Sequence, residues 1–241
     1  MAVCFSPYRI FQLHLCIILF LALASLLGHV IHITTGDAVI FGIRRIFNMD
    51  IEKNIPSLFS AFAIFCSSVV LFVLYQGYRK SNKRGWVFFL VFGFLFLCLT
   101  YDEMFSVHER LAPITRQWIT GSGLLFFTWI VPGSLFVLVV FLCSLSFLRH
   151  TDSTTRNRLI LSGAIFTGGA LGFEALGGLR IEQIGYYASV VHTSKPDLIY
   201  FLLMTCEETM EMVGIALFLY TLLRHFERNF GTLTVNVGRM A

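Results

Sequence analysis

Seven acidic side chains lie inside or at the edge of strongly apolar segments, where carboxylates are rarely found. They are Asp102, Glu103, Glu109, Glu174, Glu207, Glu208 and Glu211, half of the 14 acidic residues of the chain. A charged side chain at the centre of a membrane helix costs about 2.5–3.5 kcal/mol on insertion scales. No lysine or arginine lies deep in these segments to neutralise them. Protonation, water or a bound cation can each remove this cost, and the concentration of acids favours a cation.

These acids and one histidine form a candidate metal-binding set. It comprises Asp102, Glu103, His108, Glu109, Glu174, Glu207, Glu208 and Glu211. Carboxylates with one or two imidazoles suit iron, manganese or zinc, whereas oxygen ligands alone would suit calcium. So many carboxylates exceed the needs of one zinc ion, and we therefore expect one or two divalent ions. Asp102 and Glu207 are interpreted either as ligands or as acceptors that orient a histidine, and the other six as direct ligands.

Helical spacing brings some of these residues together and separates others. At 100° per residue, the three glutamates between positions 207 and 211 share one face of a helix. Asp102 and Glu109 are seven residues apart and nearly eclipsed, whereas Glu103 and His108 diverge from them. All four can face one centre only if their helix bends or ends near Ser106.

Two motifs resemble those of a broad group of uncharacterised bacterial multipass membrane proteins. The first, D-E-x4-H-E, consists of Asp102, Glu103, His108 and Glu109, and the second, E-E-x2-E, consists of Glu207, Glu208 and Glu211. The resemblance implies a multipass membrane protein but no particular activity. The residue set is also similar to that of carboxylate di-iron proteins, in which Glu and Glu-x-x-His ligands project from four helices. This sequence has E-x4-H and E-x-x-E instead of E-x-x-H, so the metal and the number of ions stay open.

The elements that must position these residues are predicted to be membrane helices. Hydrophobic residues make up 56% of the 241 residues and charged residues only 13%, against about 25% charged in soluble domains. A membrane helix needs about 20 mostly apolar residues, and the windows that satisfy this are 10–33, 58–78, 85–107, 124–148, 159–179 and 198–223. The sequence therefore predicts an all-α, polytopic bundle of six transmembrane helices in a single domain, 1–241. Pro132 and Gly133 predict a kink in the fourth helix.

The distribution of basic residues predicts the orientation of the bundle. Eleven of the 18 lysines and arginines fall on one side of the predicted bundle: Arg9, Arg79, Lys80, Lys83, Arg84, Arg149, Arg156, Arg158, Arg224, Arg228 and Arg239. Because basic loops stay in the cytoplasm, both termini are predicted to be cytoplasmic. The acids then lie in the outer half of the membrane. His29 and His32 end the first helix on that side, either as interfacial residues or as ligands.

Glycines in the last two predicted helices indicate close helix packing. Gly168, Gly169, Gly172, Gly177 and Gly178 surround Glu174, and Gly214 follows the glutamates of the last helix. Small residues let neighbouring membrane helices approach closely. These glycines do not form a phosphate-binding loop because no lysine follows them, and no G-x-S-x-G motif of a serine hydrolase is present.

Three functions remain open at this point. The first is a metalloenzyme that acts on a lipid, a quinone or another apolar substrate. The second is an accessory subunit of a larger membrane complex, in which the metal is structural, and the third is a cation or proton transporter. The expected partners are membrane lipids and either other membrane subunits or further copies of the chain, without nucleic acid. The motif resemblance and the lack of organelle signals favour a bacterial inner membrane. Protonated acids that serve only packing are the alternative to a metal site.

Overall fold

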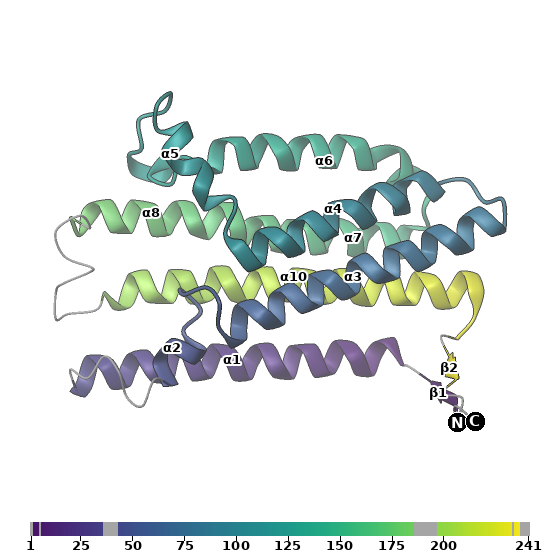
Figure 1. The fold of residues 1–241 in the computed structure, drawn as a ribbon, viewed down its shortest axis with the longest axis horizontal. Coiled ribbons are helices and arrows are strands. Elements are labelled where there is room, and N and C mark those ends of the chain that lie inside the picture. Colours follow the sequence, from purple (N-terminus) through teal and green to yellow (C-terminus); the bar gives the residue numbers. More distant parts are fainter. Residues whose placement is uncertain (1, 5, 36–42, 186–196, 233, 237–241) are drawn as a thin grey trace.

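The computed structural model describes residues 2–4, 6–35, 43–185, 197–232 and 234–236, and these form a bundle of long helices (Figure 1). The long helical elements are α1 (Pro7–Thr35), α3 (Ile55–Lys80), α4 (Trp86–Phe105), α6 (Ile130–His150), α7 (Ser153–Thr167), the π-helical segment η4 (Gly168–Phe173), α8 (Glu174–Gln183) and α10 (Leu198–Phe230). The short elements are α2 (Ile43–Phe47), η2 (Glu109–Leu111), α5 (Ala112–Thr115), η3 (Gly123–Leu125) and the strands β1 (Ala2–Cys4) and β2 (Thr234–Asn236). The predicted all-helical class is confirmed, apart from this one short pair of strands.

Within the described residues, five helical stretches are long and apolar enough to cross a membrane. They are Pro7–Thr35, Ile55–Lys80, Trp86–Phe105, Ile130–His150 and Ser153–Gln183, the last of which joins α7, η4 and α8. This confirms the multipass membrane class. The sixth long helix, α10, has 33 residues but does not belong to these five. Its apolar sequence is interrupted near the middle by Glu207, Glu208 and Glu211.

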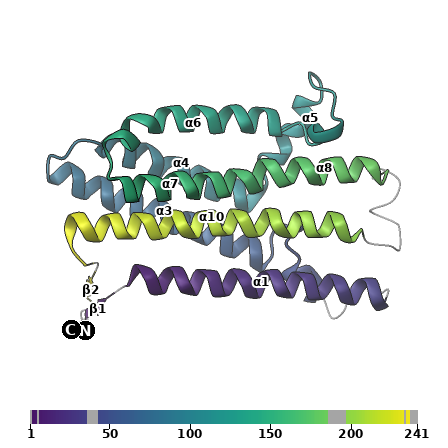
Figure 2. The same ribbon diagram turned by 180° about the vertical axis from the view of Figure 1, so that it is seen from behind.

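α10 lies at the centre of the bundle. It packs against α1, α3, α7, η4 and α8, as the two opposite views of the molecule show (Figures 1 and 2). α3 and α4 pack along each other, and the apolar core between them and α10 contains Leu71, Leu74, Phe89 and Leu222. α6 lies on the outside of the bundle, where its backbone lies near α7 and η4, and Phe147 near its end stacks on Phe88 of α4. The loose packing of α6 leaves room between it and the rest of the bundle.

The fourth predicted helix begins later than expected and is not kinked at the proline. α6 starts at Ile130 rather than at residue 124, so Pro132 and Gly133 lie in its first turn. Proline suits that position because the N–H groups of a first turn have no partner within the helix. The preceding residues form the turn η3, where Gly123 adopts a φ of +58° and donates its N–H to Glu182 at the end of α8. The kink prediction was therefore wrong.

The third predicted helix ends two residues early. α4 stops at Phe105, and Ser106 adopts a left-handed conformation with φ 47° and ψ 50°. This conformation is costly for a residue other than glycine, asparagine or aspartate. It reverses the chain direction, so that His108 returns to contact Asp102 on α4. Such a helix end near Ser106 is what the sequence requires for the acids and His108 of the first motif to face one centre.

One end of the bundle carries both chain termini and two of the helix connections. The α3–α4 and α6–α7 connections lie at the end where β1 and β2 are located (Figure 1). β1 and β2 pair antiparallel, with Val3 opposite Val235. The segment between α4 and α6, the end of α8 and the start of α10 lie at the opposite end. Both termini therefore lie on the same side of the bundle.

Candidate functional site

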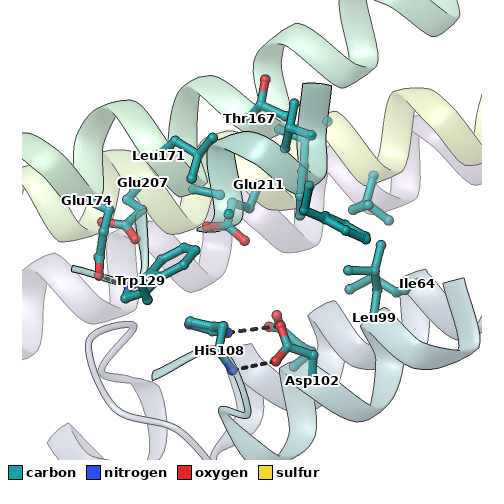
Figure 3. Close-up of a pocket in the computed structure, with 18 of the residues that line it drawn as sticks. Ile64, Leu99, Asp102, His108, Trp129, Thr167, Leu171, Glu174, Glu207 and Glu211 are labelled. Carbon is teal, nitrogen blue, oxygen red and sulfur yellow. Dashed lines mark hydrogen bonds and ion pairs between the residues drawn. The ribbon is translucent and has the colours of Figure 1, made fainter. Parts of the chain in front are cut away.

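A large cavity lies between α4, α6, the α7–α8 helix and α10, and its volume is about 1800 Å³. All eight predicted metal-site residues line it: Asp102, Glu103, His108, Glu109, Glu174, Glu207, Glu208 and Glu211. Figure 3 shows carboxylates from α4, α8 and α10 that face one another across this space. The structure therefore gathers the whole predicted set around one cavity, from helices far apart in the sequence.

Two further acids that the sequence analysis did not select also line the cavity. Asp50 and Glu52 lie between α2 and α3, outside the apolar windows. Asp50 accepts a hydrogen bond from the hydroxyl of Tyr200 at 2.9 Å. The cavity is thus lined by nine carboxylates, with Arg116 as the one lysine or arginine among the described lining residues. The only signal in the sequence was the position of both acids just before the second apolar window.

Asp102 and His108 form a tight pair at the end of α4. The backbone N–H of His108 donates to Asp102 Oδ1 at 2.8 Å, and its Nδ1 lies 2.9 Å from Oδ2 (Figure 3). Because Nδ1 faces a carboxylate, Nε2 is the ring nitrogen left for a ligand. A carboxylate that holds Nδ1–H in this way fixes the ring and makes Nε2 a better metal ligand. Of the two roles predicted for Asp102, the geometry fits the orienting acceptor.

Glu174 and Glu207 form the second group of acids. The indole Nε1–H of Trp129 donates to Glu174 Oε1 at 2.9 Å, and Glu207 on α10 interacts directly with Glu174. Glu207 is only 7% exposed, and its Oε2 has no hydrogen-bond partner within the described parts of the chain. A buried acceptor without a donor costs about 1–3 kcal/mol. Trp129, which sequence analysis did not select, also packs its ring against His108 and so joins the two groups.

The remaining glutamates of the predicted set also line the cavity. Glu208 and Glu211 line the cavity from α10, and Glu211 is seen between the two groups in Figure 3. Glu103 lies near the hydroxyl of Ser60 on α3 and interacts electrostatically with Glu52. The predicted common face of the three α10 glutamates is confirmed, since all three line the same cavity.

The helix that carries Glu174 has an irregular turn directly before it. The π-helical segment η4 ends at Phe173, and Glu174 is the first residue of α8. A Cβ at Gly169 would lie 2.8 Å from the carbonyl oxygen of Glu207 and 3.2 Å from Cγ of Glu211. Only glycine fits this contact without a shift, which confirms the predicted close packing beside the acids. π-Helical turns in otherwise α-helical segments often occur at functional sites.

The acidic residues do not form a ready-made metal centre. Among the residues that the structure describes, no three His, Cys, Asp or Glu side chains are grouped closely enough to hold a metal ion. His29 and His32, which the sequence left open as ligands, do not line the cavity; His29 stacks on Phe201. Metal binding would therefore require the carboxylates of the two groups to rotate toward each other.

Two titratable groups of the site lie beyond the end of α4. Burial raises the pKa of the Glu109 carboxyl above its ordinary value. Burial by itself would lower the pKa of His108, but the hydrogen bond and charge of Asp102 outweigh it and hold this pKa above its ordinary value. A protonated His108 and a protonated Glu109 would lower the net negative charge of the site when no metal is bound.

The cavity continues away from the acids as an apolar trough, which we define by its lining from α4, α6 and α7. Its lining residues include Phe88, Phe92, Leu95, Phe96, Val137, Val140, Phe141, Leu148, Leu159 and Phe166. The serine hydroxyls in it are satisfied locally, since Ser144 donates to the carbonyl of Val140 and Ser162 to that of Leu159. The trough therefore offers hydrocarbon contacts and no free side-chain donor from these serines.

Fold and site together define a multipass helical membrane protein with an amphipathic internal cavity that is acidic at one end. A family model described as a domain of unknown function (DUF8692) matches residues 15–226, and the chain belongs to this family. No curated protein and no solved structure matches the chain. The family description assigns no chemistry, so the function is argued from the site.

Proposed function

We propose that this chain is an integral membrane metalloprotein that binds one or two divalent ions at the acidic end of its cavity and acts there on a lipid-soluble substrate. The observation that carries the proposal is the lining of one cavity, as far as the structure describes it, by nine carboxylates and a single arginine. Carboxylates in such a place need a cation or protons to be tolerated. Iron, manganese or zinc fits a donor set of carboxylates and one imidazole.

The side chains that would hold the metal come from four parts of the chain, one of which is α4 with Glu103. His108 Nε2 and Glu109 come from the segment after α4, Glu174 comes from α8, and Glu208 and Glu211 come from α10. Asp102 would orient His108, as its two contacts with that residue support. Glu103 and Glu207 complete the ligand candidates. A bound metal ion supplies Lewis-acid polarisation of a substrate or a deprotonated water molecule.

We place this metal site in the outer half of the membrane. In this topology α10 is a sixth membrane helix, so six helices cross the bilayer and both termini are cytoplasmic. Support comes from the shared end of the two termini. Basic residues at that end include Lys83, Arg149 and Arg228. This agrees with the rule that loops on the cytoplasmic side of a membrane protein are enriched in lysine and arginine. By the motif resemblance, the membrane is a bacterial inner membrane.

Proton binding is a second candidate function for the same acids. It is favoured by the lack of a preformed group of three ligands in the described residues. A proton or cation transporter also needs polar groups on the other side of the membrane. The trough on that side is lined mainly by phenylalanine, leucine and valine. We therefore rank transport, and an accessory role with a structural metal, below the metalloenzyme.

Elemental analysis of protein purified in mild detergent without chelators tests the proposal. We expect one or two equivalents of iron, manganese or zinc in the wild type, with most of the metal lost in Glu208→Gln and Glu211→Gln. Glu227→Gln is the matched control, because Glu227 pairs with Arg224 at the other end of α10 and does not line the cavity. No stoichiometric metal in the wild type would overturn the metal site and favour protonated acids.

A further inference from the structure

The cavity is about as long as an extended lipid chain. Phe88 and Asp102 both line the cavity from α4 and are 14 residues apart. At 1.5 Å per residue, the cavity, with its trough and its acidic end together, extends roughly 21 Å along the helix axis. Leu159 and Glu174 give a similar span, roughly 22 Å, on the opposite wall. The hydrocarbon core of one leaflet is only about 15 Å deep. Because the cavity is longer than this, it can hold a long hydrocarbon chain along the bundle axis.

The trough opens sideways between α4 and α6. Phe94 and Tyr101 on α4 and Phe136 and Phe141 on α6 line the cavity, and all four are also exposed on the outer surface of the bundle. Side chains that are both lining and exposed mark the rim of an opening. In a membrane this rim faces lipid, so a substrate can enter the cavity from the bilayer without crossing water.

The acidic end of the cavity selects the polar end of such a molecule. Two divalent ions would neutralise at most four of the nine carboxylates, so an anionic headgroup would meet repulsion. The buried Oε2 atoms of Glu207 and Glu52 have no hydrogen-bond partner in the described residues, and a group with N–H or O–H donors would satisfy them. The site therefore complements a donor-bearing polar group that carries no negative charge.

We propose that the cavity binds an amphiphile with one long hydrocarbon chain and an amine or hydroxyl head. The chain lies in the apolar trough between α4, α6 and α7, and the head lies among Glu52, Glu174, Glu207 and Glu211. The molecule enters between α4 and α6. This assignment rests on the proposed function in one respect: the head lies where the metal is proposed to bind, which makes the amphiphile the substrate class of that site.

Gly163 allows the trough to be blocked without disturbing the fold. It lines the cavity on α7, and a Cβ added there would meet nothing within 4 Å. Gly163→Phe should therefore fill the trough and leave the acids untouched. Gly172→Phe is the matched control, since Gly172 also has open space around its Cβ position but does not line the cavity.

The test measures binding of three probes with equal chains to detergent-purified protein that has been incubated with divalent metal: octadecylamine, octadecanol and octadecanoate. We expect the amine and the alcohol to bind at least tenfold more tightly than the carboxylate at pH 8, and butylamine not to bind detectably. Gly163→Phe should weaken amine binding at least tenfold, whereas Gly172→Phe should bind like the wild type.

Two results would overturn the proposal: equal affinity for octadecanoate and octadecylamine, or unchanged amine binding by Gly163→Phe. Metal content measured on the same samples separates this inference from the proposed function. Gly163→Phe that keeps its metal and loses the amine supports the trough assignment. Wild-type protein without metal that still prefers the amine over the carboxylate overturns the metal site and supports the amphiphile.

Discussion

At the scale of single residues, Trp129 connects the two acidic groups of the cavity. Its indole donates to Glu174 and its ring packs on His108. Both partners are proposed metal ligands, so the side chain acts on the site through them. Residues that hold ligands in place typically change metal affinity by about 10- to 100-fold when they are replaced.

Trp129→Phe should lower the affinity for the metal about tenfold, because it removes the donor to Glu174 and keeps an aromatic ring near His108. Metal titration of chelator-treated, reloaded protein measures this change. Trp118→Phe serves as the control, since Trp118 is 85% exposed at the loop end of the bundle. Equal losses in both variants would show that Trp129 acts through general stability instead of through Glu174.

A second residue-scale prediction concerns the ion pair between the ends of α8 and α10. Arg180 contacts both carboxylate oxygens of Asp197, at 3.1 and 2.6 Å. The hydrogen bond from Arg180 holds the pKa of Asp197 below its ordinary value near 3.8. The pKa of Asp197 is lower in the folded protein than in the unfolded chain. The pair therefore stabilises the fold at pH values above the unfolded-state pKa, and this stabilisation is lost as the pH falls through the folded-state pKa.

Asp197→Asn should therefore lower the melting temperature at pH 7 and have progressively less effect below about pH 4. Asparagine is the right replacement because Asp197 also caps α10 by accepting from the N–H of Tyr200, and asparagine caps helices equally well. Melting of both proteins in detergent between pH 7 and pH 3 measures the difference. A difference in melting temperature that stays constant over this pH range would show that the charge of Asp197 is not the cause.

The residues of the site were largely predictable from sequence, because an acid inside an apolar window is anomalous wherever the fold places it. Asp102, Glu174 and Glu211 were identified on that ground alone. Asp50 and Glu52 were missed because they lie in a loop, where an acid is ordinary and only the tertiary structure shows which way it points. Whether these side chains bind a metal stays a prediction.

At the scale of elements, the contact between α7 and α10 depends on Gly214. A Cβ there would lie 2.8 Å from the backbone nitrogen of Phe166 and 2.9 Å from the carbonyl oxygen of Ser162. The two helices therefore pack backbone to backbone one turn beyond Glu211, as expected for small residues in membrane helices.

Gly214→Ala should destabilise the protein by about 1–3 kcal/mol, since backbone atoms must move to admit the methyl group. Gly163→Ala, on the facing helix, should instead stabilise it by up to about 1 kcal/mol, because alanine favours helix and the space is open. Unfolding in a series of denaturing detergent mixtures compares the two. If Gly214→Ala left the free energy of unfolding unchanged, the two helices would separate at little cost.

Sequence patterns located the long helices more reliably than their ends. The apolar windows continued through residues 124–129, where the structure forms turns instead, because hydrophobicity alone does not distinguish a helix from a buried turn. The π-helical segment could not be predicted, since its sequence of small and apolar residues also fits an ordinary helix. Tertiary packing of Gly169 on α10 accompanies the irregular turn.

At the scale of the whole molecule, the proposed topology places the loop between α4 and α6 on the outer side of the membrane, away from the cytoplasm. Trp118→Cys and Ser81→Cys, each in an otherwise cysteine-free chain, report on the two ends of the bundle. An impermeant maleimide added to intact cells should label the cysteine at position 118 and should label position 81 only after permeabilisation. The reverse pattern would invert the topology and place the metal site in the inner half of the membrane.

The π-helical segment lets the site tolerate a change in the number of residues that precede Glu174. A π-turn contains one residue more than an α-turn, so deleting one residue from η4, for example Ala170, would allow the segment to close as an ordinary α-helix. The residues after the deletion would then keep nearly the same direction around the helix axis, with Glu174 toward the cavity and Arg180 toward Asp197. Deleting one residue from the regular helix α7 would instead turn both side chains by about 100°. Length variation in this family should therefore be tolerated in η4 and absent from α7 wherever the acidic site is used.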